Sequence, residues 1–349
     1  MAHDAPRGPR KGGRPGAGHD TRAGQDPRSG TGEAPGITSL TGSTPGGMPL
    51  ALNRTPRDAL RPWVMRIGVT DLALMPGQRI ECRTFSEHPV MRIIFGARWT
   101  AHTADGVFDF EPGEEGLTLH FGPNTRHMPL VAHASFRVVT INYGPGAGGS
   151  FDLPPPAETL DRIYRLDPVS RSPTVLPGYR PQPDKRAWLD AAEEQLAAAF
   201  AAAAPWPPSP LMTAFETLCL TDPGGSLDGF ARAHAVTRRT LERAIHREWG
   251  VTPHQAQRRA RALDMAAVLL GVALEDEEQE LRLRYFDQSH LIREMRHYFD
   301  MTPGQLMNAA CPLLRITMEI RQSRRVEALA RIGAGEARPW RDPRAEPEE

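Results

Sequence analysis

The sequence contains one fifteen-residue pattern twice, fifty positions apart. The copies read RTLERAIHREWGVTP, residues 239–253, and SHLIREMRHYFDMTP, residues 289–303. In each copy the apolar residues recur at i, i+4 and i+8, as Leu241, Ile245 and Trp249, and as Leu291, Met295 and Phe299. This spacing places them on one face of a helix and leaves the arginines on the other. Each copy therefore predicts an amphipathic helix with a basic outer side, stopped at a Thr-Pro that starts the next helix.

The residues before the first copy complete a two-helix unit. LDGFARAH, residues 227–234, predicts a short helix, and Ala235 and Val236 form the turn after it. Thr237 is placed to cap the helix that follows, because its hydroxyl can accept from a free backbone N–H. A short helix, a tight turn and a basic second helix make the helix-turn-helix arrangement, in which the second helix enters the major groove. One long helix, about residues 253–270, is predicted to join the two units.

The segment RYFDQSHLIREMRHYFDMTPGQL, residues 284–306, resembles the second-unit signature of the AraC/XylS family of transcription regulators. The match covers roughly residues 226–309. The resemblance implies a DNA-binding domain of two helix-turn-helix units behind an effector-sensing, often cupin-like, β domain. The DNA-contacting residues that it implies are Thr237, Arg238, Arg239, Glu242, Arg243, Arg247, Gln288, Ser289, His290, Ile292, Arg293 and Arg296.

The second unit departs from the family pattern in its supporting helix. Positions that are apolar or glycine in the family fall near Asp276, Gln279, Glu280 and Arg284 here. Residues 226–261 hold eight Arg against three acidic residues, a balance of +5, whereas residues 262–305 hold four Arg against nine acids, a balance of −5. Because Lys and Arg drive phosphate binding, the first unit is better suited to DNA. The acidic run EDEEQE either repels DNA or forms a solvated face pointing away, and the second interpretation is favoured.

The sequence before the repeats divides into two segments that differ in composition and in apolar pattern. Residues 1–56 are rich in Gly, Pro, Arg and Ser without an aromatic residue, and this composition predicts disorder. Residues 57–170 alternate apolar and polar residues between turns, as in RIECRTFS and SFRVVTINY, which predicts antiparallel strands. The predicted fold class is α+β multidomain, with an N-terminal antiparallel β barrel or sandwich of cupin-like kind. An all-α C-terminal domain with two helix-turn-helix units follows it.

Three further regions complete the predicted division of the chain. Residues 171–210 are a helical linker whose stripe of Trp188, Ala192, Leu196 and Phe200 could form a dimer seam or pack on the β domain; packing is favoured. Residues 211–310 form the helix-turn-helix domain. Residues 311–349 form one further Arg-rich helix and a disordered tail.

Several functional classes are disfavoured by the sequence. His88, His120, His127 and His133 lack the His-x-His with a downstream Glu that a metal-binding cupin would use, so neither a metal nor another cofactor is expected. No catalytic or phosphate-binding motif is found, and an enzyme is not predicted. Three widely spaced Cys argue against a disulfide framework, and no apolar run approaches membrane-spanning length. We expect a cytoplasmic protein with no membrane association.

Two functions follow from these patterns. The first is a DNA-binding transcription regulator that reads double-stranded DNA mainly with its first unit and responds to a signal through the N-terminal domain. Its expected partners are DNA, a small-molecule effector, RNA polymerase if it is an activator, and a second copy of the chain if it dimerises. The alternative is a degenerate helix-turn-helix protein that acts through protein–protein interaction.

Overall fold

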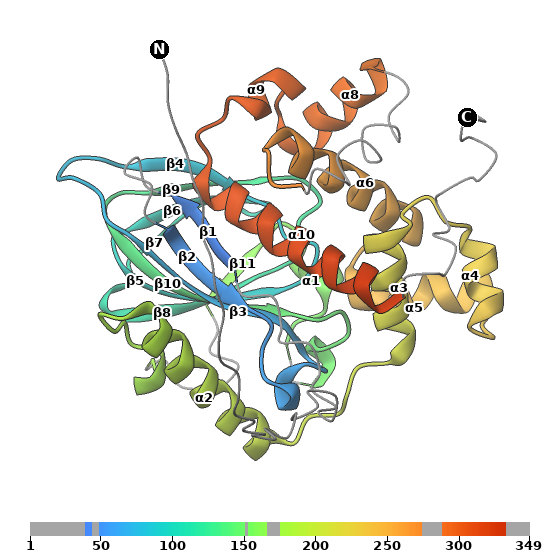
Figure 1. The fold of residues 1–349 in the computed structure, drawn as a ribbon, viewed down its shortest axis with the longest axis horizontal. Coiled ribbons are helices and arrows are strands. Elements are labelled where there is room, and N and C mark those ends of the chain that lie inside the picture. The colour runs from blue at the N-terminus through green and yellow to red at the C-terminus, as the bar shows by residue number, and fades with distance from the viewer. Residues whose placement is uncertain (1–38, 44–48, 151–152, 166–174, 274–287, 333–349) are drawn as a thin grey trace, which may run out of the picture. The chain divides into compact units, whose positions relative to one another are not determined.

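Strands from the first half of the chain pair into two antiparallel sheets (Figure 1). The computed structural model describes residues 39–43, 49–150, 153–165, 175–273 and 288–332, which all lie in one compact unit, Gly36–Glu349. The larger sheet has the strand order β1-β2-β3-β10-β5-β8-β11 and the smaller has β4-β9-β6-β7. The strands of the larger sheet are β1 (Ser39–Ser43), β2 (Pro49–Arg54), β3 (Val64–Leu72), β10 (Phe136–Tyr143), β5 (Val90–Gly96), β8 (Gly113–Phe121) and β11 (Ile163–Arg165). Those of the smaller sheet are β4 (Ile80–Thr84), β9 (Met128–Ala132), β6 (Trp99–Thr103) and β7 (Gly106–Phe110).

The two sheets enclose one apolar core between them. Alternate residues of the larger sheet, such as Ile94, Leu119 and Val138, share a buried cluster with Trp99 and Leu130 of the smaller sheet. Period-two alternation places one side of each strand in this core, which is the pattern that predicted the strands. The predicted antiparallel β domain ahead of an all-α region is therefore confirmed.

The outer face of the larger sheet is covered by helix α2 (Lys185–Ala203), which lies below the sheets in Figure 1. Trp188, Ala192 and Leu196 have no exposed surface and pack in one cluster with residues of β3, β5 and β10. The alternative in which this stripe forms a dimer seam is excluded, because its surface is already buried inside the chain. Of the two interpretations, packing on the β domain is confirmed.

The prediction of disorder up to residue 56 is wrong for its last part. Strand β2 pairs with β3 and with β1, and Leu50, Ala51 and Leu52 are each only 2 % exposed. The composition of the whole segment is dominated by Gly and Pro, which concealed the short apolar run PLALN. A strand of this length gains its stability from the partner strand and the core beneath it, so it leaves only a weak local signal.

The C-terminal half is helical. Its elements are α1 (Pro156–Thr159), α3 (Pro210–Thr221), α4 (Leu227–Ala233), α5 (Arg238–Trp249), α6 (Pro253–Leu269), α8 (Gln288–Phe299), α9 (Pro303–Met307) and α10 (Pro312–Ile332). The long helix α6 contacts both α5 and α8, as the repeat predicted. Thr237, Thr252 and Thr302 each cap the helix that follows, with the hydroxyl accepting a backbone N–H. These local expectations are confirmed.

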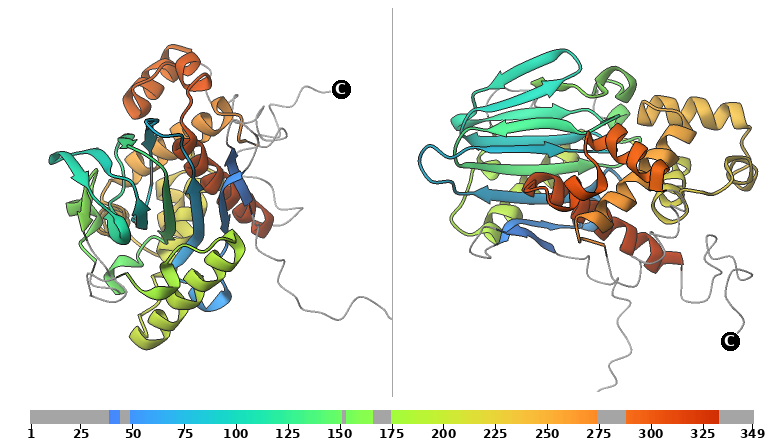
Figure 2. Two further views of the ribbon diagram at one scale, coloured as in Figure 1. Left: turned by 90° about the vertical axis from the view of Figure 1, so that its left-hand side faces the viewer. Right: turned by 90° about the horizontal axis from the view of Figure 1, so that it is seen from above.

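Helix α10 returns to the β domain after the second repeat (Figure 2). Ile316 and Ile320 join the core between the sheets, while Leu314 and Met318 pack with residues of α6 and α8. The sequence predicted this helix without a location for it. Its two apolar faces place it between the β domain and the helix-turn-helix region.

The cap of α6 gives a first prediction. Thr252 and Gln255 form a reciprocal capping box, with the Thr252 hydroxyl accepting from Gln255 N–H at 3.3 Å and Gln255 Oε1 accepting from Thr252 N–H at 2.9 Å. Replacing Thr252 with Ala should lower the unfolding free energy by about 1 kcal/mol, measured by urea titration. Thr213→Ala on the exposed surface of α3 is the control and should change it by less than about 0.5 kcal/mol. Equal effects at the two sites would contradict a role for the cap.

Candidate nucleic-acid interface

The first helix-turn-helix unit is complete in the structure. Helices α4 and α5 are joined by a turn in which Ala235 has φ +52°. Leu241, Ile245 and Trp249 form the buried face of α5, packed against residues of α3 and α4. Gly250 ends α5 in the left-handed region at φ +73°, where a side chain would also collide with the carbonyl of Pro156. The second helix is thus fixed at both ends, as a recognition helix requires.

The outer face of α5 is basic. Arg239, Glu242, Arg243 and Arg247 are exposed on it, at the spacing that the sequence predicted. Arg247 pairs with the neighbouring Glu248 at 2.5 Å. The face therefore presents guanidinium groups to solvent, which is the chemistry that binds phosphate oxygens and guanine edges.

In the described part of the chain, Arg238, unlike the exposed arginines of α5, contacts side chains of the neighbouring helices. Its guanidinium contacts Glu242 at 2.9 Å, Asp228 of α4 at 3.2 Å and His254 of α6 at 3.1 Å. These contacts tie three helices together at the start of the recognition helix. They also engage Glu242, which would otherwise be available to accept from a base.

The described part of the second unit is its recognition helix. Within α8, Ser289, His290, Ile292, Arg293 and Arg296 are exposed, and Met295, Tyr298 and Phe299 are buried. Gln288 is the first residue of α8. Asp287, which the sequence pattern makes the expected cap of this helix, lies outside the described residues, as does the acidic supporting segment around Asp276–Arg284. These exposed residues all belong to the contact set that the family resemblance implied, whereas the side chain of Gln288, also in that set, lies outside the described part of the structure.

Helix α6 connects the two units through an ion pair as well as apolar contacts. Arg258 donates to both carboxylate oxygens of Glu294 in α8, at 2.7 to 3.1 Å. Glu294 is buried while the Arg258 side chain is 46 % exposed, so water reaches the guanidinium but not the carboxylate. The two-point geometry still fixes the orientation of the pair. The ion pair therefore joins α8 to α6 in addition to their apolar contacts.

Not every arginine counted toward the first unit faces solvent. Arg259 is 2 % exposed and donates to the carbonyl oxygens of Asn124 at 2.8 Å and Glu87 at 3.0 Å. Arg261 donates to the carbonyl of Pro223 at 2.6 Å. The exposed positive charge of this unit is thus smaller than the sequence balance of +5 indicated. It is concentrated on α5 rather than on α6.

One loop of the β domain holds both recognition helices. The Phe85–His88 loop follows β4, and its His88 ring lies edge-on to Trp249 of α5 with centroids 4.4 Å apart. Its Phe85 ring lies 5.6 Å from Phe299 and 6.0 Å from Tyr298 of α8. Trp249 and Phe299 occupy the same position in the two sequence repeats. The loop therefore contacts equivalent aromatic residues in both units.

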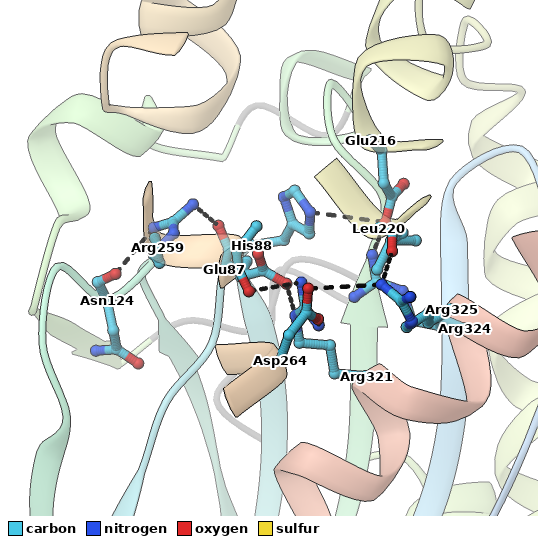
Figure 3. Close-up of polar contacts among 11 residues, drawn as sticks. Glu87, His88, Asn124, Glu216, Leu220, Arg259, Asp264, Arg321, Arg324 and Arg325 are labelled. Carbon is cyan, nitrogen blue, oxygen red and sulfur yellow. Dashed lines mark hydrogen bonds and ion pairs between the residues drawn. The ribbon is translucent and has the colours of Figure 1, made fainter. Parts of the chain in front are cut away.

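Buried charges join this loop to helices α6 and α10 (Figure 3). Arg321 of α10 donates to Glu87 at 2.9 Å and also pairs with Asp264 of α6. Arg325 donates to the carbonyl of Leu220 in α3 at 2.6 Å and lies 3.5 Å from Asp264. Arg324 pairs with Glu216 of α3. We call the following residues the interdomain charge cluster: Glu87, His88, Glu216, Arg259, Asp264, Arg321, Arg324 and Arg325.

Burial and charge shift the pKa values in this cluster. Burial would raise the pKa of Glu87, but Arg321, Arg259 and Arg324 around it hold that pKa below its ordinary value. Burial lowers the pKa of His88 well below its usual range, and the same three arginines lower it further. Glu87 is therefore ionised and His88 neutral at pH 7.

The interdomain charge cluster was missed by reasoning from sequence. Its one local signal is the pair Arg321 and Arg325, four residues apart in an Arg-rich helix. Such spacing puts both guanidinium groups on one face. The carboxylates that receive them come from distant segments, so no local pattern could identify the partners.

The histidines considered as metal ligands lie apart in the structure. His88 and His120 are buried in different places, His127 faces the carbonyl of Tyr298 at 3.1 Å, and His133 contacts Thr100 at 2.8 Å. Among the described residues, no three His, Cys, Asp or Glu side chains come together as a metal site. The three cysteines are free thiols. No helix in the described ranges is long and apolar enough to cross a bilayer.

Known proteins provide only distant comparisons. No protein-family model matches this sequence, and no curated protein matches it either. Apo ToxT from Vibrio cholerae is 8 % identical with a TM-score of 0.43, covering 69 % of this chain and 97 % of that one. ToxT with an unsaturated fatty acid bound is 10 % identical with a TM-score of 0.41, covering 69 % and 94 %.

A third solved structure is CuxR, an AraC-like transcriptional activator. It is 10 % identical with a TM-score of 0.18, over 60 % of this chain and 85 % of that one. With likenesses this distant, the function of this chain must be inferred from its own residues.

Proposed function

We propose that this protein is a DNA-binding transcription regulator of the AraC/XylS type, which reads the major groove mainly with helix α5. A signal received by the N-terminal β domain controls it. The observation that carries the proposal is the pairing of two recognition helices with exposed basic faces, both contacted at equivalent aromatic residues by the Phe85–His88 loop. A protein that only needed a helical surface for binding would not require this duplicate arrangement.

The roles of the two units differ in this proposal. Arg239 and Arg243 of α5 contact base edges, where an arginine can grip both acceptors of guanine. Arg293 and Arg296 of α8 serve mainly as phosphate contacts, because the segment supporting α8 is acidic in sequence. Thr237, Ser289 and His290, at the starts of the two helices, also belong to the proposed contact set, as do Arg238, Glu242, Arg247, Gln288 and Ile292.

Unequal contributions of the two units can be measured by footprinting on the DNA that flanks the gene. Arg239→Ala should abolish sequence-specific protection, corresponding to a loss of about 1–3 kcal/mol in discrimination. Arg293→Ala should weaken binding modestly on any sequence and reduce the salt slope by about 1. The control is Arg331→Ala, which removes one exposed arginine of α10 outside both units. Equal loss of specific protection from Arg239→Ala and Arg293→Ala would refute the proposed asymmetry.

The alternative function, protein–protein interaction, is favoured by one observation. Ile292 is 36 % exposed on the outer face of α8, at the position that Glu242 holds in the first repeat, and Met307 is 58 % exposed in α9. The second unit therefore presents apolar side chains to solvent beside its arginines. An electrophoretic mobility shift assay separates the two functions. Binding to operator DNA with a preference over random DNA supports the regulator, and its absence at low salt supports the alternative.

A further inference from the structure

A small cavity lies in the core between the two sheets, closed on one side by α10. Its volume is about 50 Å³. A cross-strand row of Asn53, Gly68, Thr140 and Arg92 runs along the larger sheet at this cavity, in the register that pairs each residue with the next. Gly68 keeps that wall open, since a side chain there would lie 2.8 Å from Cβ of Asn53.

Three residues that line this cavity each carry a buried hydrogen-bond donor without an acceptor in the described protein. The donors are Nη1 of Arg92, Nε1 of Trp99 and Nδ2 of Asn142. Arg92 is 9 % exposed and Trp99 is 2 % exposed, so both groups are shielded from solvent. Buried donors are rarely left unpaired, because each loses its hydrogen bonds to water. Three of them at one cavity indicate a ligand that supplies acceptors.

The guanidinium of Arg92 is held with one side available. Its Nη2 donates to Thr84 at 2.8 Å, and its central carbon lies 4.2 Å above the ring of Phe121. No ion pair joins Arg92 to a carboxylate among the described residues, and burial lowers its pKa to about 10. It therefore carries a positive charge at pH 7 that the protein does not neutralise locally, and an anion at Nη1 would do so.

The rest of the cavity wall is mainly apolar, with polar side chains from Asn53, Thr70, Ser86, Thr140 and Thr317. Val138 and Phe136 of β10 face Ile316 and Ile320 of α10 across it. Because one water molecule needs about 10–15 Å³ of such volume, the cavity of about 50 Å³ has space for roughly three to five non-hydrogen atoms. One buried cation, two neutral donors and apolar walls suit a singly charged anion with a short hydrocarbon part better than phosphate or sulfate.

We infer that this cavity is the effector site and binds a short aliphatic monocarboxylate, with the carboxylate on Arg92 and Trp99 and the alkyl end against α10. The regulatory part of this inference rests on the proposed function. Ser86 also lines the cavity and belongs to the Phe85–His88 loop, while Thr84 lies just before that loop. A ligand here would touch the segment that holds both recognition helices.

Calorimetric titration of the full chain with sodium propionate, at constant ionic strength, tests the binding. Propionate should bind saturably and propionamide should not, because the amide replaces an acceptor with a donor. Arg92→Met should weaken propionate binding at least about tenfold, and Trp99→Phe by roughly fivefold. The control Arg137→Met, which removes a half-buried arginine of β10 that pairs with Glu114 and does not line the cavity, should leave the affinity unchanged.

Several results would overturn the inference. Propionamide binding as well as propionate, or Arg92→Met and Trp99→Phe both retaining wild-type affinity while folded by circular dichroism, would exclude the site. Octanoate binding more tightly than propionate would exclude the small cavity as its location. Thermal unfolding should show the same ranking, with propionate raising the melting temperature of the wild type and not of Arg92→Met.

DNA binding, measured separately, distinguishes this inference from the proposed function. Propionate should change the affinity of the wild type for its operator and not that of Arg92→Met. DNA binding without Arg92-dependent propionate binding would refute the carboxylate site and leave the regulator intact. Propionate binding without any DNA binding would leave the site and refute the regulator. Binding of both, without any effect of one on the other, would refute the effector role.

Discussion

Replacing Arg321 with Met should lower the unfolding free energy by about 3–5 kcal/mol. The Arg321 side chain is buried and donates to Glu87, to Asp264 and to the carbonyl of Ala260. Met fills a similar volume but leaves two carboxylates in the protein interior with fewer partners. Unpaired buried charge is among the most destabilising changes known for single substitutions. Urea unfolding followed by circular dichroism measures the loss.

Two further variants show whether the loss arises from the buried charges. Arg331→Met removes an exposed arginine of the same helix and should change the unfolding free energy by less than about 0.5 kcal/mol. Adding Glu87→Gln to Arg321→Met should recover part of the stability, because it removes one of the unpaired carboxylates. A loss from Arg321→Met no larger than that from Arg331→Met would show that the interdomain charge cluster adds no stability.

Acid should destabilise the protein through His120, by about 3 kcal/mol between pH 6.5 and 4. This side chain has no exposed surface, its ring nitrogens have no hydrogen-bond partner among the described residues, and burial lowers its pKa to about 4. The folded state therefore keeps His120 neutral, while the unfolded chain takes up a proton below its ordinary pKa of about 6.5. Its contribution to stability is full above pH 6.5 and is lost as the pH falls toward 4.

His120→Leu isolates this effect from other acid-sensitive groups such as His88 and Glu87. The variant should lose about 3 kcal/mol less than the wild type over the same pH range, measured by urea titrations at pH 7 and pH 4. His102→Leu removes an exposed imidazole of β6 and should leave the wild-type pH dependence in place. Parallel stability curves for the wild type and His120→Leu would show that His120 is not a source of acid sensitivity.

The helices that carry the proposed DNA contacts were predictable because their signals are local. Apolar spacing located α5 and α8, and the Thr residues before each Pro marked where α6 and α9 begin. Thr237 was identified as a cap from its position alone. Periodicity and capping depend on residues within a few positions, so they can be read directly from a single sequence.

The packing between the two halves was not predictable in the same way. Arg259 was counted with the DNA-facing arginines, but α6 is buried on more than one side and turns this residue toward the β domain. The place of α10 depends on its two apolar faces, each of which packs in a separate cluster. The sequence predicted two domains joined by a linker, whereas α10 and the Phe85–His88 loop contact both halves. Such contacts join residues more than a hundred positions apart and leave no periodic pattern.

The Phe85–His88 loop has a consequence for the geometry of any site that the protein reads. Recognition helices that enter successive major grooves must stand about 34 Å apart. Trp249 and Phe299 lie at the C-terminal ends of α5 and α8, and both contact the four-residue Phe85–His88 loop. The Phe85–His88 loop therefore helps to set the separation of the two helices, in addition to α6. A change in that stretch would alter the tolerated distance between half-sites without altering which bases each helix prefers.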